Sequence, residues 1–81
     1  MTQTQILSRL RELLADTFEI DPSRVTPEAD LYRDLDLDSI DAVDLAIKLQ
    51  EMTGKRIKPD EFRSVRTVDD VMVAVDRLLA A

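Results

Sequence analysis

The chain has 81 residues, of which 44% are hydrophobic, 35% charged and only 4% aromatic, and its formal net charge is −6 at pH 7. It contains no cysteine and no histidine, which excludes disulfides, thiolate chemistry, the common zinc sites and nucleophilic catalysis with a histidine base. The length fits a single domain over residues 1–81, with a core formed by aliphatic packing between helices.

The first predicted helix covers residues 5–18. Its apolar side chains recur every three or four residues, as on one face of an amphipathic helix, and charged side chains occupy the other face. Thr2 or Thr4 is the expected N-cap. The predicted buried stripe consists of Ile6, Leu7, Leu10, Leu13, Leu14 and Phe18.

A long loop is predicted between this helix and the next, over residues 19–38. Pro22 and Pro27, together with the turn-forming sequence Asp21-Pro22-Ser23, argue against a continuous helix. So long a loop is uncommon in a small domain unless it is functional or internally packed. We expect an ordered loop that is held on the core by Ile20, Val25, Leu31, Leu35 and Leu37.

The second predicted helix covers residues 39–52, and Gly54, the single glycine of the chain, is its expected C-cap. Apolar residues spaced three or four apart predict one helix face. These residues are Ile40, Val43, Ala46, Ile47 and Leu49.

Two further helices are predicted. The segment 59–65 begins with Pro59 and two acids, which is typical of a helix of one or two turns. The last helix begins at Thr67-Val68-Asp69-Asp70, which is close to a capping box, and its expected buried stripe is Val71, Met72, Val75, Leu78 and Leu79. The predicted fold is all-α: a small four-helix bundle of three main helices and one short helix.

The excess negative charge is concentrated around one serine. Residues 28–51 carry eight acidic and two basic side chains, which accounts for the whole net charge. A surface of this kind repels nucleic acid and anionic lipid, and it attracts basic proteins. The concentration of charge around Ser39 therefore favours a protein-docking surface over a merely solubilising one.

The alternating acids Asp34, Asp36 and Asp38 resemble the start of a calcium-binding EF-hand loop. Counted from Asp34, however, the position that requires glycine is Ser39, and the position that requires a bidentate glutamate is Leu45. No metal site is therefore predicted.

Ser39 is the candidate functional residue, and its type and position allow three interpretations. Self-contained hydrolysis is disfavoured because no histidine is present and neighbouring aspartates do not activate a hydroxyl. A helix N-cap is the ordinary role of a serine at a helix start. The third interpretation is a modification site, since a helix N-terminus favours an attached phosphate group.

The run Leu35-Asp36-Leu37-Asp38-Ser39-Ile40-Asp41 resembles the Asp-Ser-Leu attachment motif of acyl carrier proteins, with Ile40 in place of the usual leucine. The similarity covers nearly the whole chain, including the Asp-Pro pair of the loop and the Thr-Val-Asp start of the last helix. The resemblance implies a carrier and not an enzyme. It also implies that a 4'-phosphopantetheine arm is attached to Ser39, flanked by Asp38 and Ile40, and that its thiol holds an acyl chain as a thioester.

The resemblance further implies a docking helix and an acyl pocket. The expected docking residues are Asp36, Asp38, Ile40, Asp41, Asp44, Ile47 and Glu51, and the expected pocket residues are Val43, Leu49, Ile57, Phe62 and Val65. The implied partners have basic docking surfaces: a phosphopantetheinyl transferase, ketosynthases, acyltransferases, ketoreductases and dehydratases.

Lys48 is a departure from the otherwise acidic docking helix, and it suggests partners that differ from those of a housekeeping fatty acid carrier. The run over residues 35–41 resembles that of polyketide or aryl polyene carriers, which implies a specialised pathway. Two alternatives stay open: a peptidyl or aminoacyl carrier, and a helical docking module that is never loaded. No membrane span or signal peptide is predicted, and we expect a cytoplasmic protein that is a monomer on its own.

Overall fold

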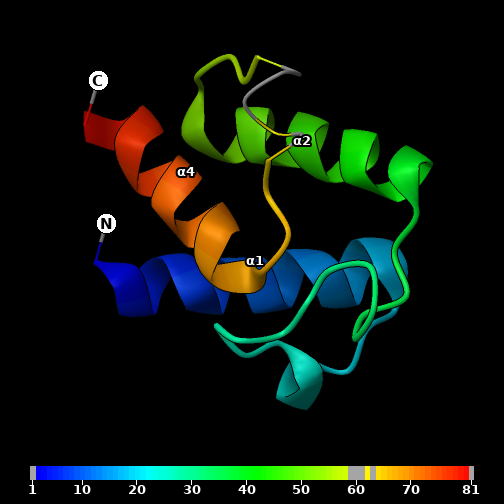
Figure 1. The fold of residues 1–81 in the computed structure, drawn as a ribbon. Helices are drawn as coiled ribbons and strands as arrows, with labels where there is room; N and C mark the ends of the chain where they lie inside the picture. Colours follow the sequence, from blue (N-terminus) through cyan, green and yellow to red (C-terminus); the bar gives the residue numbers. More distant parts are fainter. Residues whose placement is uncertain (1, 59–61, 63, 81) are drawn as a thin grey trace.

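The computed structural model describes residues 2–58, 62 and 64–80, and this part of the chain is all-α (Figure 1). Three α-helices are present in it: α1 (Gln3–Phe18), α2 (Ser39–Thr53) and α4 (Val68–Ala80). A short 3-10 helix, η1 (Pro22–Arg24), lies within the long loop. The expected all-α fold is confirmed, and the short helix that the structure describes is this 3-10 turn.

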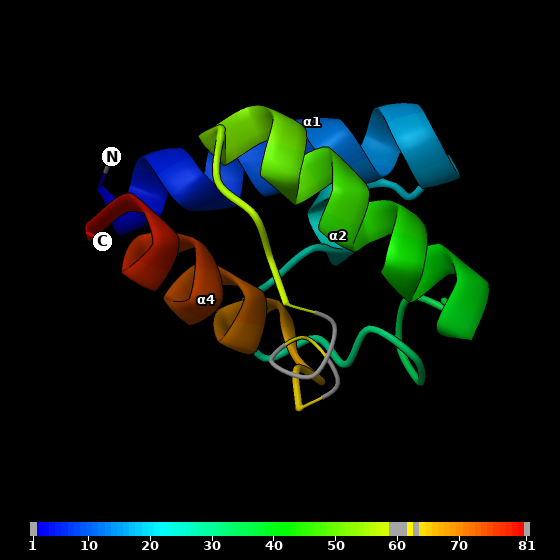
Figure 2. The same ribbon diagram turned by 90° about the horizontal axis from the view of Figure 1, so that it is seen from above.

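The helices form a small bundle in which α4 packs against both α1 and α2. α1 and α2 run in roughly opposite directions, and the two ends of the chain lie at the same end of the molecule in both views (Figures 1 and 2). The loop between α1 and α2 leaves α1 and enters α2 at the opposite end of the molecule, and between these points it runs back to the start of α4 (Figure 1). None of the helices in the described residues is long and apolar enough to cross a membrane.

Each of the three α-helices begins with a reciprocal capping box, in which two orphan N–H groups are satisfied by side chains. For α1, the Gln5 N–H donates to Thr2 Oγ1 at 3.2 Å and the Thr2 N–H donates to Gln5 Oε1 at 2.8 Å. For α4, the Asp70 N–H donates to Thr67 Oγ1 and the Thr67 N–H donates to Asp70 Oδ2, both at 3.1 Å. Of the two expected caps Thr2 and Thr4, Thr2 is the one used, and the predicted cap Thr67 is confirmed.

The C-terminus of α2 is also as predicted. Gly54 caps it with φ +69°, a left-handed conformation that other residues adopt only with strain.

The loop 19–38 is ordered and packed on the core, as predicted. Its five anchoring side chains are all buried: Ile20, Val25, Leu31, Leu35 and Leu37. Backbone hydrogen bonds join the loop to the start of α4: the Leu31 N–H donates to the Arg66 carbonyl at 2.7 Å and the Val68 N–H to the Ala29 carbonyl at 3.0 Å. These bonds fix the loop that leads into α2.

The apolar residues of α2 lie on two faces of the helix. The buried residues are Ala42, Leu45 and Leu49, whereas most of the predicted stripe lies outside. Ile40, Val43 and Ile47 are 73%, 60% and 45% exposed. α2 therefore carries two apolar stripes with the same helical spacing, one buried and one exposed.

The predicted short helix over residues 59–65 falls on positions 59–61 and 63, which lie outside the described residues. Of its neighbours, Phe62 and Val65 are buried. The Phe62 N–H donates to the Lys58 carbonyl at 3.2 Å, and the Val65 N–H donates to the Phe62 carbonyl at 3.1 Å. Phe62 and Val65 thereby extend the core alongside α4.

Candidate functional site

Ser39 is the first residue of α2, and its side chain is exposed. The N-cap is the preceding residue, Asp38: its Oδ1 accepts from the Asp41 N–H at 2.9 Å, and Asp41 Oδ2 accepts from the Asp38 N–H at 3.1 Å. The interpretation of Ser39 as the helix cap is therefore wrong. Within the described residues the Ser39 hydroxyl has no hydrogen-bond partner, so it is available for chemistry.

The loop before Ser39 is held in a fixed shape by side chains that accept backbone N–H groups. Asp30 Oδ1 accepts from the N–H groups of Tyr32 and Arg33, both at 2.9 Å. These bonds, led by the one from Arg33, hold the pKa of the Asp30 carboxyl below its usual range. The Arg24 guanidinium donates to the Asp34 carbonyl.

The acidic residues next to Ser39 do not gather into a metal site. Asp36 has a positive φ of 57°, and Asp36 and Asp38 are both exposed. In the part of the chain that the structure describes, no group of three or more acidic side chains is arranged to hold a metal ion. The geometry therefore leaves negative charge open to solvent and partners.

The exposed face of α2 combines apolar and acidic side chains. Ile40, Asp44, Ile47 and Glu51 follow one another at spacings of four, three and four residues, which places them on one side of the helix; all four are exposed. Lys48 Nζ lies 3.9 Å from Glu51 Oε2, an exposed ion pair that contributes little to stability. The structure thus brings most of the predicted docking residues onto one surface.

Beside this face lies a groove of about 420 Å³, hereafter the α2 groove, with Ser39 on its rim. The groove is mainly apolar, and the residues that line it are Tyr32, Ser39, Ala42, Val43, Ala46, Ile47, Gln50, Ile57 and Phe62.

Four of these lining residues were missed as site residues: Tyr32, Ala42, Ala46 and Gln50. Gln50 and Ala46 continue the helical spacing of Val43 and Ile47, so the sequence held a signal for them. Tyr32 lies in the loop, where no periodicity indicates its position.

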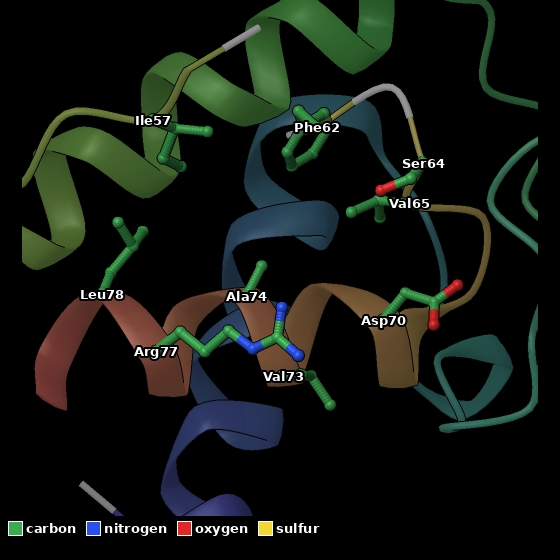
Figure 3. A pocket seen from close by; sticks show the side chains of 9 residues that line it. All are labelled: Ile57, Phe62, Ser64, Val65, Asp70, Val73, Ala74, Arg77 and Leu78. Carbon is green, nitrogen blue, oxygen red and sulfur yellow. The ribbon is translucent and has the colours of Figure 1, made fainter. Parts of the chain in front are cut away.

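A second cavity, hereafter the α4 cavity, has a volume of about 470 Å³ and lies between α4 and the segment that contains Ile57 and Phe62 (Figure 3). In Figure 3, Ile57 and Phe62 face α4 from the opposite side of the cavity, and the side chain of Arg77 runs along α4 towards Val73. The lining residues are Ile57, Phe62, Ser64, Val65, Asp70, Val73, Ala74, Arg77 and Leu78.

The five residues predicted to form an acyl pocket occupy three environments. Val43 lines the α2 groove and Val65 lines the α4 cavity. Ile57 and Phe62 line both. Leu49 is fully buried in the core and is not among the lining residues of either space.

Comparison with known proteins identifies the family. The family model described as "Phosphopantetheine attachment site" matches residues 8–73. Acyl carrier protein 2 of Ralstonia nicotianae is 70% identical over 81 residues, and the match covers 100% of both chains. An acyl carrier protein of Thermosynechococcus vestitus is 37% identical, again over 100% of both chains.

The fold is shared with a solved structure. The crystal structure of an acyl carrier protein from Thermotoga maritima superposes with a TM-score of 0.86 at 24% identity, over 96% of this chain and 91% of that one. The chain therefore belongs to the acyl carrier protein family, whose members are carriers that bear a covalently attached 4'-phosphopantetheine group and are not enzymes.

Proposed function

We propose that Ser39 is the residue that carries the 4'-phosphopantetheine arm. The observation that supports this most directly is that Asp38, and not Ser39, caps α2. Asp38 makes the capping bonds, and the exposed Ser39 hydroxyl has no hydrogen-bond partner in the described residues. A phosphate attached there would lie at the positive end of the helix dipole, close to N–H groups of the first turn. The residues present therefore fit the group.

When bound, the arm supplies the thiol that this cysteine-free chain lacks, and the thiol holds an acyl chain as a thioester. The chain's own residues hold the site in place. The reciprocal bonds between Asp38 and Asp41 fix where α2 begins, and Ile40 and Asp38 flank the attachment point on the surface. The function is that of an acyl shuttle between enzymes, carried out by one domain spanning residues 1–81.

Partner enzymes dock on the exposed side of α2. The proposed contacts are Asp36, Asp38, Ile40, Asp41, Asp44, Ile47 and Glu51. Acidic residues around exposed isoleucines suit a basic rim with an apolar centre. The proposed partners are a phosphopantetheinyl transferase, ketosynthases, acyltransferases, ketoreductases and dehydratases. They bind the carrier in the cytoplasm, and the carrier is a monomer on its own.

The acyl chain lies in the α2 groove and against Phe62. Val43, Ile57 and Phe62 line this space, Leu49 forms the core beneath it, and Val65 lies beyond Phe62 in the α4 cavity. Apolar walls of this kind are favourable for a hydrocarbon chain because burial removes its surface from water.

The pathway is proposed to be of polyketide or aryl polyene type and not housekeeping fatty acid synthesis. Lys48 supports this because it puts a cation, paired with Glu51, on the docking surface and so changes which partner charges are complementary. If, in a panel of purified ketosynthases, only housekeeping fatty acid enzymes accepted the loaded protein, the pathway assignment would be wrong.

The attachment site is tested by intact-protein mass spectrometry after incubation with coenzyme A and a promiscuous phosphopantetheinyl transferase. We expect the protein to gain one phosphopantetheine group and the Ser39→Ala variant to gain none. Circular dichroism of both proteins serves as the folding control. A folded wild-type chain that gains no mass, or a Ser39→Ala variant that still does, would contradict the proposal.

A further inference from the structure

Gln50 is a polar residue in the otherwise mainly apolar wall of the α2 groove, and its orientation is fixed by the backbone. The Ile57 N–H donates to Gln50 Oε1 at 2.8 Å. Because a backbone N–H is only a donor, it must face the oxygen of the side-chain amide and not the nitrogen. The turn after α2 thereby locks Gln50 in one rotamer and one amide orientation.

The hydrogen bond from Ile57 uses the amide oxygen of Gln50 and leaves its side-chain NH2 group as an unused donor. Within the described residues it has no hydrogen-bond partner, although Gln50 is half-buried and lines the groove. Its neighbours in the wall include Val43, Ala46 and Ile47, which offer no side-chain acceptor. Among the described residues no buried side-chain nitrogen or oxygen lacks a partner, so this NH2 group is accessible to water and can donate instead to a polar atom of a ligand in the groove.

The distance between Gln50 and Ser39 determines whether an arm attached to Ser39 reaches the donor. Gln50 follows Ser39 by eleven residues on α2, which corresponds to about 16 Å along the helix axis. Ser39 and Gln50 both line the groove, and Ile57 contacts Gln50. An arm attached to Ser39 that lies along the groove can therefore reach Gln50.

We propose that the Gln50 side-chain amide donates a hydrogen bond to a carbonyl oxygen of the loaded arm as the arm lies in the α2 groove. The proposal rests on the attachment of the arm to Ser39. The carbonyl oxygen has two sources, the arm with its thioester or a 3-oxo group of the cargo. In either case Gln50 offers a hydrogen-bond donor to an oxygen-bearing segment of the ligand, whereas a hydrocarbon segment makes no use of it.

The variant Gln50→Glu separates this role from the structural one. A glutamate keeps the acceptor for the Ile57 N–H and nearly the same shape, but as a carboxylate it cannot donate. Lys48→Gln is the matched control, since it makes the same change of −1 in charge two residues away and lies outside the lining of the groove. The Gln50→Glu carboxylate also repels the carbonyl oxygen of the arm. This repulsion weakens the binding of the arm in the groove, as the loss of the donor does.

Each protein is loaded with an octanoyl or a 3-oxo-octanoyl group from the corresponding coenzyme A thioester. Intact mass confirms loading, so a failure of the attachment proposal is seen at this step and is distinct from a failure at Gln50. Hydroxylamine cleavage then reports how far the thioester is protected. Loss of one hydrogen bond should speed cleavage by roughly 2- to 13-fold in Gln50→Glu and leave Lys48→Gln unchanged.

Acceleration with the 3-oxo chain alone assigns the acceptor to the cargo, and equal acceleration with both chains assigns it to the arm or thioester. Unchanged cleavage of both chains would overturn the proposal. NMR of the wild-type protein gives an independent measurement that no variant can confound. The side-chain amide signals of Gln50 should shift when the arm is loaded, and signals that stay in place would equally overturn the proposal.

Discussion

At the scale of single residues, the site depends on which of two neighbours caps α2. Asp and Ser are both good N-cap residues, so position alone did not distinguish Asp38 from Ser39. The capping box does distinguish them, because its partner stands three residues after the cap. Asp41 can reciprocate from that position for Asp38, whereas Ser39 would face Ala42, which has no polar side chain. The sequence therefore held the information that frees the Ser39 hydroxyl.

This assignment predicts that the two neighbours differ in their effect on stability. Asp38→Ala should lower the free energy of unfolding by about 1 kcal/mol, because α2 loses its cap. Ser39→Ala should change it by no more than about 0.5 kcal/mol, as is usual for an exposed position without contacts. Urea denaturation of the unmodified proteins measures both. An equal loss in the two variants would show that Ser39 also supports the helix start.

At the scale of the elements, the sequence predicted where the helices begin and end, whereas local pattern does not determine which of the two apolar stripes of α2 is buried. Thr2, Thr67 and Gly54 are capping residues whose chemistry is local, so the sequence was sufficient to identify them. The orientation of α2 is not local. Two stripes have the same spacing, and the choice between Leu45 and Val43 as the buried side depends on how α4 and the loop fit against the helix.

Because the exposed side of α2 is acidic, reversing one charge on it should slow modification by the phosphopantetheinyl transferase. We expect Asp44→Lys to lower kcat/KM for loading roughly tenfold at low salt, through weaker steering of a basic partner, with a smaller effect at high salt. Glu12→Lys makes the same change of charge at an exposed position of α1, and it serves as the control.

Loading rates that fall equally in Asp44→Lys and Glu12→Lys would indicate that net charge, and not the docking surface of α2, governs the encounter. An effect of Asp44→Lys that persists at high salt would indicate a direct contact at this residue in place of long-range steering.

At the scale of the whole molecule, several carboxylates organise the backbone away from the exposed side of α2. Three of them, Asp21, Asp30 and Asp70, have a pKa below the usual range because they accept backbone N–H groups. They lie in the loop or at the start of α4 and not on the exposed side of α2. A fall in pH therefore weakens the hydrogen bonds that hold the loop and the start of α4, and it also reduces the negative charge of the docking surface.

For Asp70 the N–H groups of Arg66 and Thr67 lower the carboxyl pKa, with Arg66 the larger cause. A lowered pKa in the folded state means that the contribution to stability is complete above the ordinary value of 3.8 and is lost as pH falls through the folded-state pKa. Asp70→Asn should therefore be less stable at neutral pH. Its stability should also fall less steeply in acid, and the two curves should converge at low pH.

Urea midpoints measured between neutral pH and about pH 3 test this prediction. Asp69→Asn, one residue earlier and exposed, is the control and should follow the wild-type slope. A wild-type slope in Asp70→Asn would show that the capping box of α4 does not depend on the charge of Asp70.

The backbone hydrogen bonds between the loop and the start of α4 also set an order of events during synthesis. A nascent chain that has exposed α1, the loop and α2 already presents Ser39, but the carbonyl of Arg66 and the N–H of Val68, which hold Leu31 and Ala29 in place, have not yet left the ribosome. The loop before Ser39 then lacks its lateral support, and α2 lacks the helix against which it packs. The support of the loop before Ser39 is therefore complete only after the start of α4 has been synthesised and has folded against the loop.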